Sequence, residues 1–215
     1  MKSLFLGIAL IIILGFGGLV YRNATEHPTQ PIACPLDAEM CPDGTSVSRT
    51  GTSCTFPVCP PPNVSLPSIS LSFALPEGFA VAALPDSASV AAYETFVATS
   101  SISDASIIIR RYAINASSTA LATIQQTAVG GPSGLPVSAT SFTSTMLGNH
   151  RFTVVSIERF EGVIDMAYYL ARGTDVLRFD AIDRNVANWT DPNLDISVLP
   201  ARVALVKLLA TLQGQ

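Results

Sequence analysis

An uninterrupted apolar run from Leu4 to Val20 constrains this chain more than any other feature of its sequence. The run reads LFLGIALIIILGFGGLV, and Lys2 is the only charged side chain before it. In a helix these residues would cover roughly 25 Å, close to the thickness of the hydrocarbon core of a bilayer. We therefore predict an anchor or signal sequence at residues 1–21, with an N-terminal transmembrane helix that places the rest of the chain outside the cytoplasm.

Two other roles of this leader stay open. A cleaved signal peptide has a shorter apolar core that ends at small residues, whereas Arg22 stands where a small residue would be needed before Ala24. A spanning helix in the opposite orientation is the second alternative, because Arg22 partly balances Lys2. The expected location is a membrane anchor with the bulk of the chain in the periplasm or at the cell surface, or secretion if the leader is cleaved.

The four cysteines, Cys34, Cys41, Cys54 and Cys59, all fall in one short segment. An even number of cysteines behind an export signal is typical of a disulfide framework, here two bridges with three alternative pairings. A four-thiolate zinc site normally has paired C-x2-C knuckles, whereas six, twelve and four residues separate these cysteines. The segment therefore predicts a disulfide-linked module at residues 34–59, between a tether at 22–33 and a proline-rich linker at 60–68.

Residues 69–215 combine strand-like runs with two helix-like segments. One helix is expected after Ser117 and another near Pro200. Apolar and polar side chains alternate over residues 164–171 and 175–182, which predicts an antiparallel hairpin that turns at Gly173. In its second strand, Arg178 and Asp180 would point away from the core. The pattern predicts an α+β fold in which helices cover an antiparallel β-sheet.

A family resemblance agrees with this fold class. The opening ISLSFALPEGFAV resembles the start of PsbP-like domains, which comprise the photosystem II extrinsic subunit and its relatives, although Trp is usual there where Phe79 stands. The closing segment FDAIDRNVANWTDPNLDISVLPARVALVKLLATLQ is similar to that family's end. The resemblance covers residues about 69–213 and implies a PsbP-like α/β/α sandwich that binds or assists assembly. The C-P-D-G-T pattern of the cysteine module resembles a motif of predicted exported bacterial proteins.

The sequence lacks the usual signatures of catalysis. It has no Gly-rich phosphate loop, H-E-x-x-H motif or dinucleotide fingerprint, and Ser133 is not in a G-x-S-x-G elbow. His27 lies in the tether, and His150 is expected at a solvated turn. The oxygen-rich residues 180–195 lack the alternate spacing and the glycine of a calcium loop. We expect no cofactor and no metal site.

Charge narrows the range of partners. The net charge is −4 and Lys2 and Lys207 are the only lysines, so the chain lacks the basic face that nucleic acids require. We predict a membrane-tethered, non-catalytic binding or assembly module, anchored through residues 4–20, with a protein or envelope component as partner. Tyr169 and Trp189 are the candidates for the partner-binding surface. The alternatives are an extracytoplasmic hydrolase with Asp and Ser residues around 180–195, and a purely structural envelope protein.

Overall fold

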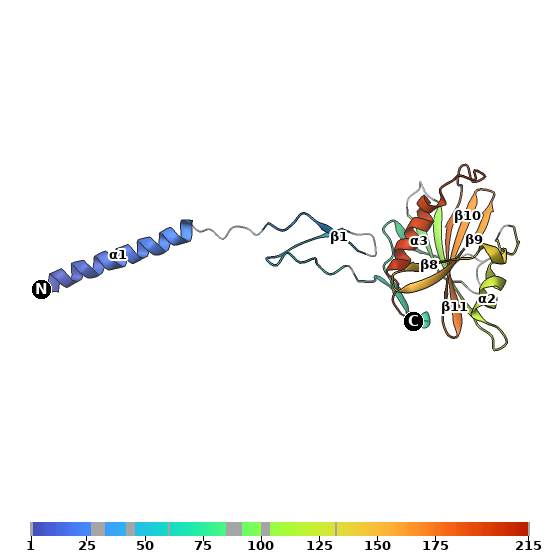
Figure 1. The fold of residues 1–215 in the computed structure, drawn as a ribbon, viewed down its shortest axis with the longest axis horizontal. Coiled ribbons are helices and arrows are strands. Elements are labelled where there is room, and N and C mark those ends of the chain that lie inside the picture. Colours follow the sequence, from blue (N-terminus) through green and yellow to red (C-terminus); the bar gives the residue numbers. More distant parts are fainter. Residues whose placement is uncertain are drawn as a thin grey trace. The chain divides into compact units, whose positions relative to one another are not determined.

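The chain forms two units in a computed structural model that describes residues 2–26, 33–41, 46–59, 61–84, 92–99, 104–131 and 133–214 (Figure 1). The smaller unit comprises Met1–Ala38 and Ser48–Pro57, and the larger unit comprises Glu39–Val47 and Val58–Gln215. Part of the predicted tether, residues 27–32 with His27, lies outside the described residues. The predicted boundaries of the five segments remain a prediction.

The smaller unit begins with the helix α1 (Lys2–Glu26). Within the part of the chain that the structure describes, no helix is both long and apolar enough to cross a membrane. This finding corrects the prediction of an N-terminal transmembrane helix.

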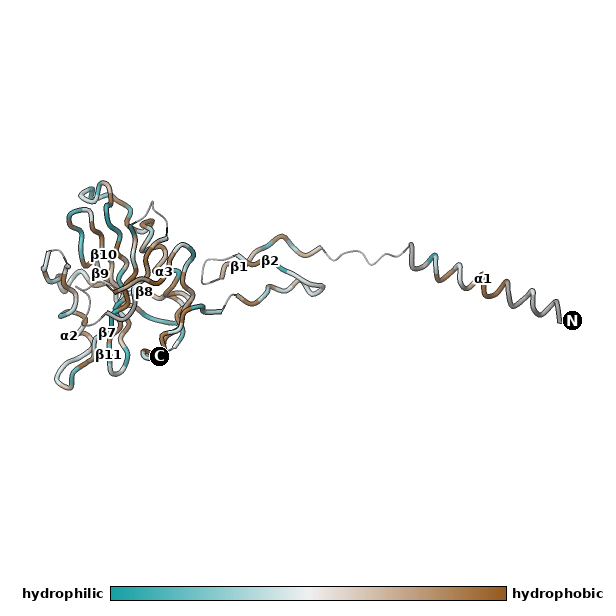
Figure 2. The backbone as a smooth tube through the Cα atoms, turned by 180° about the vertical axis from the view of Figure 1, so that it is seen from behind, coloured by the Kyte–Doolittle hydropathy of each residue, from teal (hydrophilic) through white to brown (hydrophobic). Residues whose placement is uncertain are grey.

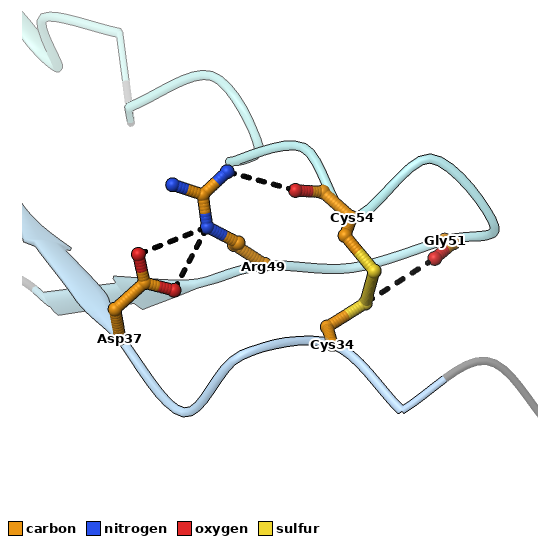
Figure 3. Close-up of a disulfide and its surroundings, with 5 residues drawn as sticks. All are labelled: Cys34, Asp37, Arg49, Gly51 and Cys54. Atoms are coloured by element: carbon orange, nitrogen blue, oxygen red, sulfur yellow. Dashed lines mark hydrogen bonds and ion pairs between the residues drawn. A yellow bond between two sulfur atoms is a disulfide. The ribbon is translucent and has the colours of Figure 1, made fainter.

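Two disulfide bonds, Cys34–Cys54 and Cys41–Cys59, confirm the predicted framework and select one of the three pairings. The first lies in the smaller unit, where Arg49 Nε donates to both carboxylate oxygens of Asp37 at 2.8 and 3.0 Å and Arg49 Nη1 donates to the Cys54 carbonyl at 3.0 Å (Figure 3). Because disulfides persist in oxidising compartments, the bridges indicate an extracytoplasmic environment.

A seven-stranded antiparallel sheet dominates the larger unit (Figure 1). Its spatial order is β5-β6-β7-β11-β10-β9-β8. The strands are β5 (Phe79–Ala82), β6 (Ala92–Ala98), β7 (Ala105–Ala113), β8 (Thr143–Leu147), β9 (His150–Phe160), β10 (Val163–Ala171) and β11 (Asp175–Asp183). Two small sheets pair β1 (Ala38–Met40) with β2 (Ser46–Ser48) and β3 (Val64–Leu66) with β4 (Leu71–Phe73). Short 3-10 turns are η1 (Pro67–Ile69), η3 (Ala139–Ser141) and η4 (Ile196–Val198).

Tight turns explain why the strands from β8 to β11 follow one another as neighbours. Glu161 and Gly162 join β9 to β10 with φ of 49° and 79°, the positive values that a two-residue hairpin turn requires. The predicted hairpin of β10 and β11 is confirmed, with Tyr168 opposite Phe179. Connections this short leave no chain for helices between the strands.

The fold is therefore mostly β, which corrects the predicted α+β sandwich with helices covering the sheet. The larger unit has two described α-helices, α2 (Ala120–Thr127) of 8 residues and α3 (Pro200–Ala210) of 11. Thr119 caps α2 by accepting a hydrogen bond from the Ala122 N–H. Pro200 starts α3, as predicted, at a position where its missing N–H costs no hydrogen bond. Each helix is too short to cover a sheet of seven strands.

The two helices pack on opposite faces of the sheet. Side chains alternate between faces along a strand, and in β10 Tyr168 belongs to the core cluster that contains Leu205 of α3, whereas Tyr169 belongs to the cluster that contains Ile124 of α2. Hydrophobic residues recur along β7, β10 and β11, the centre of the sheet (Figure 2). We call these faces the α3 face and the α2 face.

Candidate functional site

A cleft of about 730 Å³ lies in the larger unit at the turn between β10 and β11. Its charged lining residues are Arg111 of β7, Arg172 of the turn and Asp175, the first residue of β11. His150, at the start of β9, also lines the cleft. The segment around η1 and Gly214, near the end of the chain, also line the cleft. Residues far apart in the sequence therefore meet at one end of the sheet.

Strand register brings the charged groups together. Arg172 follows β10 directly, and its N–H donates to the Asp175 carbonyl at 2.8 Å, which closes the hairpin. In β7, Arg111 lies opposite Leu177 of β11. Leu177 belongs to the α3-face core, so Arg111 and Asp175 are on the α3 face, at its end.

Asp175 joins two arginines into a cluster that we call the open trio (Arg111, Arg172 and Asp175). Arg172 binds the carboxylate with two parallel hydrogen bonds, from Nε at 2.7 Å and from Nη2 at 2.6 Å. Arg111 Nε donates to the same carboxylate at 2.6 Å. Arg172 Nη1 also donates to the Ile69 carbonyl at 2.6 Å. Paired bonds of this kind fix the plane of a guanidinium as well as its position.

Electrostatics keeps Asp175 ionised. Burial alone would raise the pKa of this carboxyl, but hydrogen bonds from Arg172 and Arg111 outweigh burial and lower the pKa below its usual value of 3.8. The side chain of Asp175 is only 2% exposed, whereas that of Arg111 is 46% exposed. The trio therefore presents guanidinium groups, rather than its carboxylate, to the cleft.

The remaining wall of the cleft is held by backbone contacts. Gln213 and Ser72 exchange two backbone hydrogen bonds of 3.0 and 2.8 Å. Gly214 has φ of +103°, and a Cβ there would meet the Ser70 carbonyl at 2.0 Å, so only glycine fits. His150, which we predicted at a solvated turn, is the half-buried first residue of β9, and its Nε2 lies 3.3 Å from the Leu212 carbonyl.

A second cluster of two arginines and one aspartate, which we call the buried trio (Arg110, Arg178 and Asp180), lies on the α2 face. Asp180 is fully buried and accepts from Arg110 Nε at 2.6 Å and from Arg178 Nε. Arg178 Nη1 donates to the Thr127 carbonyl at the end of α2 at 2.6 Å. Helix C-terminal carbonyls carry partial negative charge, which favours a cation there.

Asp165 of β10 lies beside the buried trio. Its Oδ2 lies 3.6 Å from Arg178 Nη2, and its Oδ1 has no hydrogen-bond partner among the described residues. Burial and the neighbouring Asp180 raise the pKa of the Asp165 carboxyl well above its usual value, against the opposing effect of Arg178. Folding therefore places a second carboxyl group beside this arginine pair at an electrostatic cost.

The structure separates the two residues predicted for a partner-binding surface. Tyr169 is 1% exposed and packs in the α2-face core, so a partner at the surface would not reach it. Trp189 is half-buried in the loop after β11, where its ring contacts Phe160 edge to face at 6.4 Å. The predicted disulfide residues are all in bridges.

The residues of the hydrolase alternative have local structural partners. Asp183 Oδ1 accepts from the Ala201 N–H at 2.9 Å, at the start of α3. Asp191 and Asp195 each accept from a backbone N–H two residues further on, at 2.8 and 2.9 Å. Outside that segment, Ser133 Oγ donates to Glu158 at 2.8 Å. Among the described residues, no three His, Cys, Asp or Glu side chains converge on a point that could hold a metal ion.

Sequence reasoning missed the open trio. Its Arg111 and Asp175 are 64 residues apart, and single arginines in strands are usually read as solvent-facing. The one available signal was Arg172 and Asp175 on either side of a hairpin turn, a spacing at which opposite charges meet across the turn.

Comparisons with known proteins do not identify a family. No family model matches the chain, and no curated protein matches it. A crystal structure from Bacteroides thetaiotaomicron VPI-5482 is similar at 9% sequence identity and a TM-score of 0.39, over 67% of this chain and 45% of that one. The match thus spans less than half of that protein, and a TM-score this low carries no argument about fold or function.

Proposed function

We propose that this protein is a non-catalytic binding or assembly module of an extracytoplasmic space, and that the cleft holds its ligand. The two disulfides support the location, because such bonds persist in oxidising compartments. The apolar run at residues 4–20 supports export of the chain. The resemblance of residues about 69–213 to PsbP-like domains favours binding over catalysis.

The open trio is the observation that carries this proposal. Its guanidinium groups are fixed in advance by a buried carboxylate, so little conformational entropy is lost when a ligand binds. The cleft of about 730 Å³ also falls within the range of roughly 300–1,000 Å³ that is common for small-molecule sites. These properties fit a small molecule or the end of a partner chain.

The lining of the cleft favours binding over hydrolysis. A hydrolytic site needs a nucleophile or an activated water next to a general base. Asp175 is saturated by three N–H donors from the two arginines. The Nε2 of His150 lies against the Leu212 carbonyl, and none of the described bonds joins His150 to a lining hydroxyl.

Filling the cleft tests the proposal. Gly173 lines it, and a Cβ added there meets nothing within 4 Å, so Gly173→Phe should occlude the cleft without strain. Gly131 is equally unobstructed and does not line the cleft, which makes Gly131→Phe the matched control. The ligand panel comprises simple sugars, sugar acids, amino acids and short peptides, with thermal shift of the full-length protein as the readout.

We expect binding to wild type and to Gly131→Phe but not to Gly173→Phe. Ligands that bind all three proteins equally would place the site elsewhere. Conversion of any ligand to products would show that the module is an enzyme. Either result would contradict the proposal.

A further inference from the structure

We propose that the group held in the cleft is a carboxylate, bound by the free guanidinium edge of Arg111. This inference rests on the proposed function, namely that the cleft holds a ligand, and it names the chemical class of that ligand. Three observations carry it: the spare donors of Arg111, the excess positive charge of the open trio, and the second carboxyl group that lies beside the buried trio.

The spare donors belong to Arg111. A guanidinium has five N–H groups, and the described contacts of Arg111 use one of them, the Nε–H that donates to Asp175 at 2.6 Å. Its side chain is 46% exposed. Arg172, in contrast, donates through Nε, Nη1 and Nη2. Arg111 is therefore the contact residue for a ligand, while Arg172 and Asp175 are positioning residues.

The charges of the open trio do not balance. Two guanidinium groups surround one carboxylate, and none of the other described lining residues is acidic. The result is a surplus of one positive charge at the wall of the cleft. A ligand group with a single negative charge would balance it.

The buried trio provides an internal precedent. It has the same composition, two arginines around one aspartate. There the protein supplies a second carboxyl group, Asp165, 3.6 Å from the outer nitrogen of Arg178. In the open trio none of the described residues occupies the corresponding place beside Arg111. A carboxylate from outside the protein would complete the same arrangement.

Charge favours a carboxylate over a phosphate monoester. The two outer nitrogens of a guanidinium match two oxygens of a carboxylate or of a phosphate equally well, so charge decides between the two groups. A phosphate monoester carries about −1.5 to −2 charges at neutral pH, more than the surplus of the open trio. Because Arg111 is half-exposed, a ligand carboxylate stays partly hydrated and avoids the cost that burial imposes on Asp165.

Matched pairs of ligands test the inference on the full-length protein. D-glucuronate and its neutral amide, D-glucuronamide, have nearly the same shape and differ by one charge. N-acetylalanine and N-acetylalaninamide do the same for a peptide chain end, so the two pairs separate a sugar acid from a peptide as the source of the carboxylate. D-glucose 6-phosphate is the phosphate monoester. Affinities come from calorimetry, and the arginine Nε–H signals in NMR spectra locate the contact.

We expect at least one acid to bind more than tenfold more tightly than its amide and to shift the Arg111 signal. Arg111→Gln should weaken that acid by about tenfold to a hundredfold, the usual loss for hydrogen bonds to a charged group. Arg111→Lys, which keeps the charge and loses the planar fork, should lie between. The control is Arg184→Gln, because Arg184 is 39% exposed, lies 3.7 Å from Asp104 and does not line the cleft.

A positioning role for Asp175 predicts a change of selectivity. Asp175→Asn removes one negative charge, so the preference for D-glucose 6-phosphate over the acid should rise severalfold. A purely structural role would lower both affinities together. Arg111→Lys keeps the inference testable should Asp175→Asn fail to fold.

Three results would overturn the inference: amides that bind as well as acids, a phosphate monoester that binds wild type more tightly than either acid, or an acid whose affinity is the same in Arg111→Gln. A fourth result, failure to bind either acid, would also overturn it. If neutral ligands bind and Gly173→Phe abolishes their binding, the proposed function survives and only the carboxylate is wrong. If no binding depends on Gly173, both proposals fail.

Discussion

The open trio and the buried trio contain the same types of side chain, two arginines and one aspartate, in opposite surroundings. Arg110 and Arg111 are neighbours in β7, yet they point to opposite faces of the sheet, and each binds an aspartate of β11. On the α2 face, Asp180 and Arg178 are buried, and Asp165 adds a second carboxyl group. On the α3 face, Arg111 opens to a cleft. Burial turns one cluster into a structural element and leaves the other with donors for a ligand.

The two trios also differ in the free energy that it costs to remove their charges from water. Charges that leave water must recover their hydration energy from partners of good geometry. The buried trio does so through Asp180, which pairs with Arg110 and Arg178, while burial raises the pKa of the neighbouring Asp165 carboxyl. The open trio keeps its carboxylate ionised and lets one arginine stay partly hydrated. We therefore expect the buried trio to dominate stability and the open trio to dominate binding.

The largest effect on stability should come from breaking the buried trio. Asp180→Ala removes the acceptor shared by Arg110 and Arg178. Removing one partner of a buried ion pair typically costs about 3–5 kcal/mol, and we expect a loss of that size in urea unfolding. The matched control is Asp104→Ala, which removes an exposed aspartate 3.7 Å from Arg184 and should cost less than about 1 kcal/mol. Equal losses would refute the contrast between the two environments.

Breaking the open trio should cost less. Asp175→Ala leaves Arg111 free to hydrate, and we expect a loss of about 1.5–3 kcal/mol, the range for hydrogen bonds to charged groups. The folded-state pKa of Asp175 lies below 3.8, so its contribution is present above pH 3.8 and fades as the pH falls through the folded-state value. Urea unfolding of wild type and variant across this range checks the sign. A difference in stability between wild type and Asp175→Ala that widens as the pH falls would contradict this prediction.

Asp165→Asn should raise the free energy of unfolding at neutral pH, whereas the two previous substitutions lower it. The folded state raises the pKa of Asp165 above 3.8, so it binds more protons than the unfolded state and loses stability as the pH rises from 3.8. Because an amide does not ionise, the substitution removes the cost of holding a buried carboxylate and should stabilise the protein by up to about 1 kcal/mol at pH 7. The gain should vanish below pH 3.8. Destabilisation at neutral pH would show that Asp165 is held by its pairing with Arg178.

Reduction of the disulfides should have the smallest effect on the two trios. Both bridges join residues within 34–59, and neither involves β7, β11 or the turn between β10 and β11, which supply the trios. We expect limited proteolysis after reduction to cut within residues 33–59 and to spare the sheet. Oxidised protein is the control. Cleavage inside β7, β10 or β11 after reduction would show that the bridges stabilise the sheet as well.

Local features of the fold were predictable from sequence. Alternation and Gly173 predicted the β10–β11 hairpin, and Pro200 with its apolar spacing predicted α3. Cysteine count predicted two bridges, but their pairing depends on which backbones approach each other. The amount of helix was overestimated, because strand-like runs with short turns leave little chain for helices.

The trios were not predictable, for a physical reason. Arg178 and Asp180 alternate with apolar residues, which predicts a solvent-facing side. In the fold α2 packs on this side of β11, Arg178 donates to the Thr127 carbonyl of α2, and both residues are buried. A single strand does not reveal whether a distant helix will cover its second face. Arg111 and Asp175 meet through strand pairing across 64 residues, which the spacing of residues along the chain does not encode.

The most direct test of the account is the calorimetric comparison of each acid with its amide in wild-type and Arg111→Gln protein. We predict that wild type prefers one acid over its amide more than tenfold and that Arg111→Gln removes most of this preference. An unchanged preference in Arg111→Gln, or none in wild type, would contradict it.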